Sequence, residues 1–573
     1  MTMFRATLAA LLLTASPAVL ADTLVDNVVG RTINTNGQVE QFTGLLFDDA
    51  GTIKRLIRSG DKKPKPRKEY QYHIDGKGRV MLPGMIDAHA HVMDIGFAAL
   101  SLDLSDTTSL ADALNRIGKF AAEHPDRPWI FGRGWNQELW KLGRFPTAAE
   151  LDAVTGGRPA WLGRVDGHAG WANTAALKAA GVSAATKDPA GGSIERGADG
   201  TPAGVLIDSA MELVNAKVPP PRAEDRDVAF ATAQQILFKR GITAVADMGT
   251  GIEDWQTYRR AGDANRLYVR VMAYAAGPDQ MTLIGGPGPS PWLYQDRLRL
   301  NGVKLYLDGA LGSRGAWLKT PYADAPGTRG LPQLNQTQLG NIMSRAAMDG
   351  FQVAVHAIGD EANATVIGAI SDLSGTYKGD RRWRVEHAQI VDPKDFAKFA
   401  SSGAIASMQP IHQTSDRLMA EARLGPDRLA GAYPWKSLKS AGVRLAFGSD
   451  APVEMADPWA GLAAAISRQG PDDQPAGGWQ PQERLSAAEA LAAYTAGAAY
   501  AGFAESKFGR LAPGLRADFV LVDIDPLAAS AAQLRATKVS ETWIGGGRVW
   551  SADEGTTAGK PTNGAFFAAR LTE

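Results

Sequence analysis

The chain has 573 residues, of which 45% are hydrophobic and 21% charged, enough apolar sequence for a large core and more than one structural unit. Lys and Arg together number 61, as do Asp and Glu, so the formal net charge is zero. This balance disfavours nucleic acid or an anionic membrane as a partner. No apolar run beyond the N-terminal segment is long enough to cross a bilayer.

Residues 1–21 have the layout of a secretory signal peptide: a basic residue at Arg5, an apolar stretch over Leu8–Ala15, and a small-residue end before Asp22. We therefore expect export, to a bacterial periplasm or the medium, with a buried N-terminal helix as the alternative. Because the chain has no cysteine, an exported form has no disulfides, and any metal must be held by nitrogen and oxygen ligands.

Both ends of the chain read as short strands separated by turns. Neither end can bury a face alone, so residues 22–80 and 509–573 are predicted to form one composite β-sandwich. The candidate strands are Leu24–Val29, Gly44–Phe47, Ile53–Ile57, Asp518–Val522 and Glu541–Val549.

Residues 81–508 alternate apolar strand patterns with helical patterns such as Leu339–Ala347 and Asp392–Phe399. This βα alternation predicts an α/β fold, a (β/α)₈ TIM-type barrel. The candidate strands are Val80–Ala88, Ile242–Ala246, Leu267–Ala273, Gly302–Leu307, Gln352–Val355, Arg382–Val385, Ala404–Ser407 and Val443–Phe447. Ser486 and Glu489 have capping-box spacing ahead of the last helical run.

A large insert, residues about 100–240, separates the first two candidate strands. It holds five tryptophans, at positions 129, 135, 140, 161 and 171. They are predicted to form the insert's own core, since aromatic side chains dominate burial in small domains. The alternative is that one or two of them line a substrate pocket.

Metal-type side chains recur just after apolar, β-branched runs, where the carboxyl ends of barrel strands would lie. They are His89 and His91, His356, His387 and Asp450. Side chains alternate along a strand, so the two imidazoles of His89 and His91 point to the same side. The carboxyl ends of barrel strands form the catalytic mouth, so these side chains predict a metal site there.

Each of these residues has a plainer interpretation when it is taken alone. The histidines fit hydrogen-bonded core positions, and Asp450 fits an Asx-turn before Pro452. Lys304 lies inside an apolar run, where a lysine is costly unless it is paired or chemically altered. Pairing with Asp308 or Glu386 is one account of it.

Six motifs together resemble the amidohydrolase superfamily and, more narrowly, amidohydrolase family 3, the branch that contains N-substituted formamide deformylases. The resemblance covers nearly all of the chain after the signal segment. The motifs are Leu82–His91, Val303–Gly309, Val355–Asp360, Val385–Ala388, Gly448–Val453 and Gly509–Asp518.

The resemblance implies two divalent metal ions, one bound by His89, His91 and Asp450 and the other by His356 and His387. It further implies that Lys304 carries carbon dioxide as a carbamate that bridges both ions. Zinc is expected first from the ligand types, with iron, manganese or nickel as alternatives. A further motif in the insert, Asp166–Asn173, would place His168 near the substrate as a group that polarises the carbonyl.

These expectations combine into a hydrolase in which a metal-activated hydroxide attacks an amide-type carbonyl of a small molecule, while Asp450 carries the proton to the leaving nitrogen. The alternatives are a deaminase of the same superfamily with one metal, and a catalytically inactive periplasmic binding protein. The insert tryptophans suggest an apolar N-substituent. Arg314 would bind a substrate carboxylate or form a surface salt bridge. A homo-oligomer is compatible with the sequence.

Overall fold

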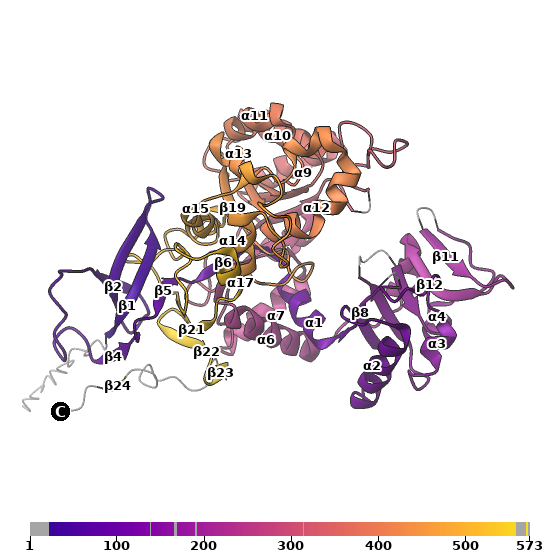
Figure 1. Cartoon of the computed structure of the whole chain (residues 1–573), viewed down its shortest axis with the longest axis horizontal. Helices are drawn as coiled ribbons and strands as arrows, with labels where there is room; N and C mark the ends of the chain where they lie inside the picture. Colours follow the sequence, from indigo (N-terminus) through magenta and orange to yellow (C-terminus); the bar gives the residue numbers. More distant parts are fainter. Residues whose placement is uncertain are drawn as a thin grey trace, which may run out of the picture.

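The computed structural model describes residues 22–137, 139–165, 169–189, 192–312, 314–556 and 569–570. The predicted signal peptide lies outside them. Three β-sheets organise this part of the chain: a parallel barrel sheet, a terminal sheet built from both ends of the chain, and a sheet formed by the insert. In Figure 1 the terminal sheet and the insert lie on opposite sides of the barrel.

The barrel sheet contains eight parallel strands within the described residues, as the sequence predicts. In the order in which they pair, they are β6 (Met85–Ala90), β13 (Ile242–Thr250), β14 (Arg270–Ala276), β15 (Leu298–Tyr306), β16 (Gln352–Ala357), β17 (Arg384–His387), β18 (Ile405–Met408) and β19 (Arg444–Phe447).

The barrel is nearly closed, with β6 and β19 as its two edge strands. Two backbone hydrogen bonds join the chain near the ends of these strands. The N–H of Asp450 donates to the carbonyl of His89 at 2.7 Å, and the N–H of His91 donates to the carbonyl of Ala451 at 2.9 Å. The closure therefore falls at the residues predicted to bind metal.

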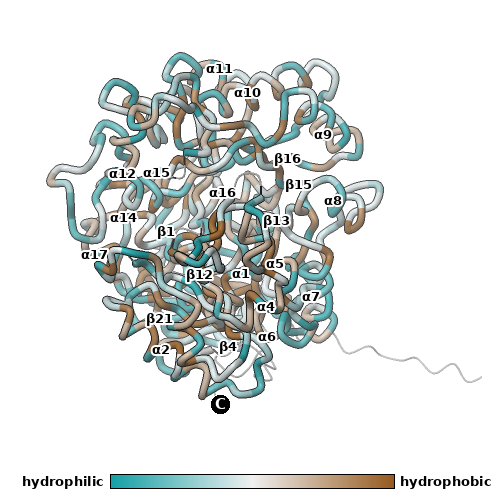
Figure 2. Tube along the Cα trace, turned by 90° about the vertical axis from the view of Figure 1, so that its right-hand side faces the viewer, coloured by the Kyte–Doolittle hydropathy of each residue, from teal (hydrophilic) through white to brown (hydrophobic). Residues whose placement is uncertain are grey.

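Helices surround the barrel sheet, and hydrophilic residues follow their outer surfaces in Figure 2. The Ser486–Glu489 capping box is present at the start of α15, as predicted, but the apolar run that follows divides into two helices. The helices are α1 (Val92–Leu100), α6 (Ala223–Lys239), α7 (Ile252–Asp263), α8 (Gly277–Gly285), α9 (Gln336–Met348), α10 (Asp360–Ser374), α11 (Phe396–Ser402), α12 (Pro410–Leu424), α13 (Trp435–Ser440), α14 (Pro458–Ser467), α15 (Ala487–Ala493), α16 (Ala496–Ala501) and α17 (Ala531–Arg535).

The first predicted barrel strand, Val80–Ala88, is wrong in one respect: it is two strands in two different sheets. Strand β5 (Val80–Pro83) joins the terminal sheet, and β6 continues into the barrel. The break falls at Gly84, where a Cβ atom would lie 2.2 Å from Oγ1 of Thr243. The Thr243 side chain lies so close to the backbone of Gly84 that only glycine fits there, and an apolar pattern does not reveal that change of sheet.

The terminal sheet contains ten strands among the described residues, drawn from both ends of the chain. All pair within one hydrogen-bonded sheet, so the predicted sandwich of two stacked layers stays a prediction. The strands are β1 (Thr23–Ile33), β2 (Val39–Phe47), β3 (Ile53–Ile57), β4 (Tyr72–Asp75), β5, β20 (Phe519–Val522), β21 (Val539–Ile544), β22 (Gly547–Ser551), β23 (Gly555–Thr556) and β24 (Ala569–Arg570).

Between β6 and β13 the described residues form a six-stranded sheet with helices of its own. Its strands are β7 (Leu102–Asp103), β8 (Ile130–Trp135), β9 (Ala160–Arg164), β10 (Ala169–Ala172), β11 (Gly192–Arg196) and β12 (Pro202–Asp208), and its helices are α2 (Leu110–Glu123), α3 (Ala148–Asp152), α4 (Thr174–Ala180) and α5 (Glu212–Asn215).

The five tryptophans of this region are all buried, and they pack in two apolar clusters within it. The indole N–H of Trp135 donates to Leu162 at 2.7 Å, and that of Trp171 donates to Thr147 at 2.8 Å. They therefore serve as core residues, and the alternative placement in a substrate pocket is not observed.

In the part of the chain that the structure describes, no helix combines the length and the apolar character that a membrane span requires.

Candidate metal centre

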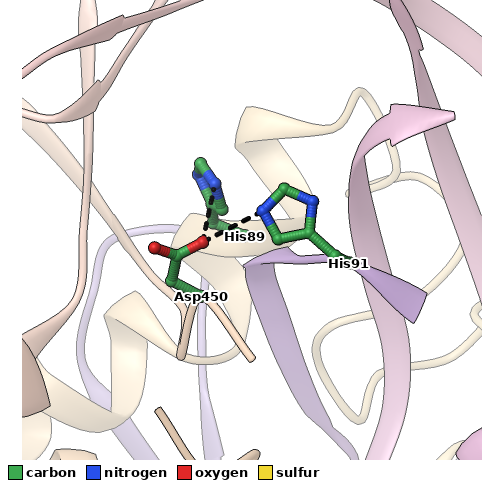
Figure 3. A group of neighbouring side chains, drawn as sticks. All are labelled: His89, His91 and Asp450. Carbon is green, nitrogen blue, oxygen red and sulfur yellow. Dashed lines mark hydrogen bonds and ion pairs between the residues drawn. The ribbon is translucent and has the colours of Figure 1, made fainter. Parts of the chain in front are cut away.

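His89, His91 and Asp450 meet where the barrel closes (Figure 3). His89 lies on β6 and is fully buried, and His91 directly precedes α1. The Nε2 atoms of His89 and His91 lie 3.3 and 3.1 Å from the same Asp450 oxygen, Oδ1. Side chains from the first and last barrel strands thus converge on one point, as predicted.

The orientation of the His89 ring is fixed from behind by Glu386. Nδ1 of His89 lies 2.6 Å from Oε2 of Glu386, and Arg384 contacts the other carboxylate oxygen at 2.7 Å. Burial raises the pKa of Glu386, but Arg384 and the bond from His89 outweigh it and hold that pKa at about 2. Glu386 is therefore an acceptor, and Nδ1 of His89 carries the proton.

In the neutral form of His89, Nε2 therefore carries a lone pair, and this lone pair faces the carboxylate of Asp450. A proton on Nε2 or a metal ion between the two atoms makes this contact favourable. With Glu386 behind the ring as its support, His89 presents Nε2 toward Asp450 and Lys304, which is the orientation that a metal ligand requires.

His356 is the penultimate residue of β16, His387 ends the neighbouring β17, and their ring centroids lie 4.6 Å apart. Nδ1 of His387 lies 2.8 Å from Oε1 of Gln409, which leaves its Nε2 unprotonated in the neutral form. Burial lowers the pKa of His356 to about 3, aided by Lys304, and burial holds the pKa of His387 well below its ordinary value. Both rings are neutral, which is the form that binds metal.

Lys304 lies in the barrel interior on β15, and its Nζ is 3.3 Å from Nε2 of His89. Burial lowers the pKa of this amine to about 8. Neither predicted partner holds it. Asp308 accepts the backbone N–H groups of Trp317, Ile358 and Gly359, at 2.9, 3.0 and 2.8 Å. Glu386 is bound by Arg384 and His89, and no carboxylate lies within ion-pair distance of Lys304 among the described residues.

Sequence reasoning missed His412, a buried residue on α12. Its Nε2 lies 3.2 Å from Oδ2 of Asp450, and its Nδ1 lies 3.4 Å from Oε1 of Glu454. Burial lowers the pKa of His412, but the two carboxylates outweigh it and raise that pKa to about 10. The same rule that found the other histidines would have found it, because it follows the predicted strand Ala404–Ser407 by five residues.

Asp450 is the residue on which the site converges. Burial raises its pKa, but the neighbouring His89 and the bonds from His412 and His91 hold that pKa well below the ordinary range. Its φ is +61°, and that of His387 is +73°, in the left-handed region that non-glycine residues seldom adopt. Such strain at two converging side chains is typical of a functional site.

Two groups of side chains place one ligand atom each within 4.8 Å of one another: His89, His91 and Asp450, and His387, His412 and Asp450. The structure thus gathers the predicted set at one mouth of the barrel, with Lys304 and His356 beside it. His168 lies outside the described residues. Arg314 forms the alternative salt bridge, with its Nη2 2.9 Å from Asp324.

Comparison with known proteins agrees with this geometry. A family model described as "Amidohydrolase family" matches residues 73–550. The chain is 34% identical over 513 residues to YtcJ of Bacillus subtilis (strain 168), covering 88% of this chain and 95% of that protein. It is 27% identical over 485 residues to an N-substituted formamide deformylase of Arthrobacter pascens, covering 82% and 89% of the two chains.

Among solved structures, an uncharacterized metal-dependent hydrolase from Pyrococcus horikoshii OT3 aligns with a TM-score of 0.75 at 26% identity, over 89% of this chain and 99% of that one. The family model spans most of the sequence and includes every residue of the site described above. The chain therefore belongs to the amidohydrolase family and is a metal-dependent hydrolase of that superfamily.

Proposed function

We propose that this hydrolase cleaves a non-peptide carbon–nitrogen bond of the amide type in a small molecule. The observation that carries the proposal is the contact between Nε2 of His89 and Oδ1 of Asp450, two acceptors 3.3 Å apart with the His89 proton held on the other side by Glu386. A metal ion bound between the two atoms makes this contact favourable and uses both as ligands.

The residues fit a pair of divalent ions. His89, His91 and Asp450 would hold one ion, and His387 with the adjacent His356 the other, since imidazole nitrogens and a carboxylate without sulfur suit such ions. Zinc is the metal we expect first, with iron, manganese or nickel as alternatives. When bound, such ions polarise a carbonyl group and lower the pKa of a water molecule.

Asp450 is the proton carrier in this proposal. Its low pKa makes it a carboxylate that can accept a proton at neutral pH and pass it to the leaving nitrogen. Oδ2 of Asp450 is bound by His412, so the side chain is held by both oxygens. His412, which lies between the carboxylates of Asp450 and Glu454, acts as a hydrogen-bond donor that orients Asp450.

Lys304 is proposed to carry a carbamate. Its buried amine has no carboxylate partner among the described residues, and addition of carbon dioxide to a neutral amine gives a carboxylate with release of one proton. The modified side chain would supply the oxygen ligands that bridge two ions. An unmodified lysine favours a single ion, as in the rival deaminase.

Three exposed apolar residues lie near the site residues, either in space or along the chain. Tyr306 ends β15 with its ring centroid 5.4 Å from that of His356, and 42% of the residue is exposed. Val453 and Met455, just past Asp450, are 70% and 67% exposed. Exposed apolar side chains beside a catalytic group indicate contact with a ligand. We therefore propose a substrate with an apolar group next to the scissile bond.

Two parts of the proposal rest on residues that the structure does not describe. His168 would polarise the substrate carbonyl, by family resemblance. Residues 1–21 would direct export and be removed before Asp22. Mass spectrometry of the protein from the producing cell tests the second point, because an N-terminus other than Asp22 or its neighbours contradicts it.

The central experiment combines metal analysis with hydrolysis of a panel of N-formyl, N-acyl and cyclic amides by the purified protein. We expect two ions per chain, an added mass of one carbon dioxide, and amide hydrolysis that chelation abolishes. One ion with an unmodified Lys304 and ring deamination would favour the deaminase. Ligand capture without turnover in the metal-loaded protein would favour the binding protein.

A further inference from the structure

A cavity lies at the floor of the barrel, at the amino ends of β17, β18 and β19. Its volume is about 500 Å³. The metal centre lies at the carboxyl ends of the same strands, so the two sites are at opposite ends of the barrel. The side chains that matter for its chemistry are Lys378, Asp380, Arg381, Arg382, Arg444 and Tyr500.

Four of these side chains are cationic, and one is a carboxylate. Arg382 is already neutralised, since it lies 2.8 Å from a carboxylate oxygen of Asp380 and 2.8 Å from one of Glu505. Lys378, Arg381 and Arg444 have no ion pair with any residue that the structure describes. The cavity therefore holds a surplus of positive charge.

The arginines of this cavity are oriented by protein contacts, while Lys378 and Arg444 are exposed to solvent. Arg381 donates from Nη1 to the carbonyl of Ala347 at 2.9 Å. The guanidinium carbon of Arg444 lies 4.1 Å from the centroid of the Tyr500 ring, and that of Arg382 lies 3.8 Å from the same ring. Stacking orients the planar donors of an arginine, so less side-chain entropy is lost when an oxyanion binds.

The backbone around the cavity also leaves it open. Gly403 and Gly442 line it, with φ values of +71° and +102°, which favour glycine over any other residue. A Cβ atom at either position would meet no atom within 4 Å. The loops before β18 and β19 therefore turn at residues whose missing side chains leave room for a ligand.

We propose that this floor cavity binds a small oxyanion that carries two or more negative charges, a phosphate or a polycarboxylate. Its volume falls in the range of small-molecule sites. Arginine side chains recognise phosphate and carboxylate groups through paired N–H donors, and the lysine adds a point charge. The site is separate from the reaction at the mouth and does not depend on it.

Isothermal titration calorimetry of the full, metal-loaded protein tests this proposal at constant ionic strength. Inorganic phosphate is titrated in one experiment and citrate in another, which separates the two sources of oxyanion. The variant K378Q/R444Q removes two cations, neither of which makes a hydrogen bond or ion pair with described residues. The matched control K119Q/R222Q removes two exposed cations elsewhere, on α2 and before α6.

We expect at least one of the two anions to bind, with an affinity about tenfold weaker in K378Q/R444Q and unchanged in the control. Because phosphate can also bind at the metal centre, the comparison of variants is decisive. Equal affinity of the original protein and K378Q/R444Q for both anions would overturn the proposal. So would the failure of both anions to bind the original protein at millimolar concentrations.

Discussion

The two ends of the barrel are built on the same strands but favour opposite charges. At the mouth, neutral imidazoles and the Asp450 carboxylate converge, an arrangement suited to cations. At the floor, Arg381 and Arg444 line a cavity without matching carboxylates, an arrangement suited to anions. Strand β17 shows the contrast within a few residues, because it follows Arg382 at the floor and ends at His387 at the mouth.

The barrel keeps side chains of opposite charge apart along its axis. Arg384 lies between the two ends, fully buried, and it is bound to Glu386, to Ser407 at 2.9 Å and to the hydroxyl of Tyr274 at 3.1 Å. A buried guanidinium with this many acceptors is satisfied, so it supports the mouth without adding free charge to it.

The largest expected effect comes from Asp450→Asn, which tests whether the mouth is the catalytic end. The amide keeps the shape of the side chain but cannot accept the proton, so kcat should fall about 10²–10⁴-fold. The matched control, Asp349→Asn, removes a carboxylate that pairs with Arg345 on the barrel surface and should leave kcat near its original value. A D450N enzyme within about twofold of the original kcat would contradict the role of Asp450.

A smaller effect is expected for Glu386→Gln, which removes the acceptor behind His89. Loss of such a supporting group weakens metal binding by about 10–100-fold. Competition with a chelator measures the affinity. The control is Glu541→Gln, which breaks the ion pair to Arg79 in the terminal sheet, far from the mouth. If both variants bind metal equally well, Glu386 does not orient a ligand.

His412→Gln should cost about tenfold in kcat, since one hydrogen bond to a charged partner contributes about 1.5–3 kcal/mol. The substitution removes the hydrogen bond from His412 to Oδ2 of Asp450, through which His412 orients the catalytic carboxylate. In the D450N background the same change should therefore cost nothing further, which a double-mutant cycle measures. His124→Gln, in the insert, is the control. Additive losses in the cycle would show that His412 acts independently of Asp450.

The smallest effect is expected on stability, from Glu489 on the barrel exterior. Its carboxylate is paired, unlike the cations Lys378 and Arg444 of the floor cavity, which have no ion pair with described residues. Its carboxylate lies 3.2 and 3.1 Å from Lys436 and Lys439 and closes the capping box with Ser486. Burial raises its pKa, but these partners lower it from 4.5 to about 2. Glu489→Gln should lower the free energy of unfolding by about 1 kcal/mol at neutral pH.

The sign of the pH dependence follows from that lowered pKa. A carboxylate whose pKa is lower in the folded state stabilises the fold above its unfolded value, and that contribution is lost as pH falls through the folded value. The difference between the original protein and E489Q should therefore shrink as pH falls from about 4.5 to about 2. Urea denaturation at several pH values checks this, and a pH-independent difference would contradict it.

Much of the barrel and the site followed from sequence patterns. Eight apolar runs marked the barrel strands, because a strand buried on both faces must be apolar along its length. His89, His356, His387 and Asp450 each follow such a run, and parallel strands end on the same face of the barrel, so their convergence could be predicted.

Other features depended on contacts that no local pattern records. The change of sheet at Gly84 is required by its approach to Thr243, a residue far along the chain. The support of His89 by Glu386, the second contact of Asp450 with His412, and the unpaired amine of Lys304 each depend on how strands pack side by side.

The sequence by itself determined the strands, the ligand types and the family, because periodicity and residue chemistry are local properties. Only the tertiary structure decided which nitrogen of His89 faces Asp450, that the insert tryptophans are core residues, and that the floor of the barrel gathers more cations than carboxylates. The physical reason is that proton positions, burial and charge balance are set by neighbours distant in the chain.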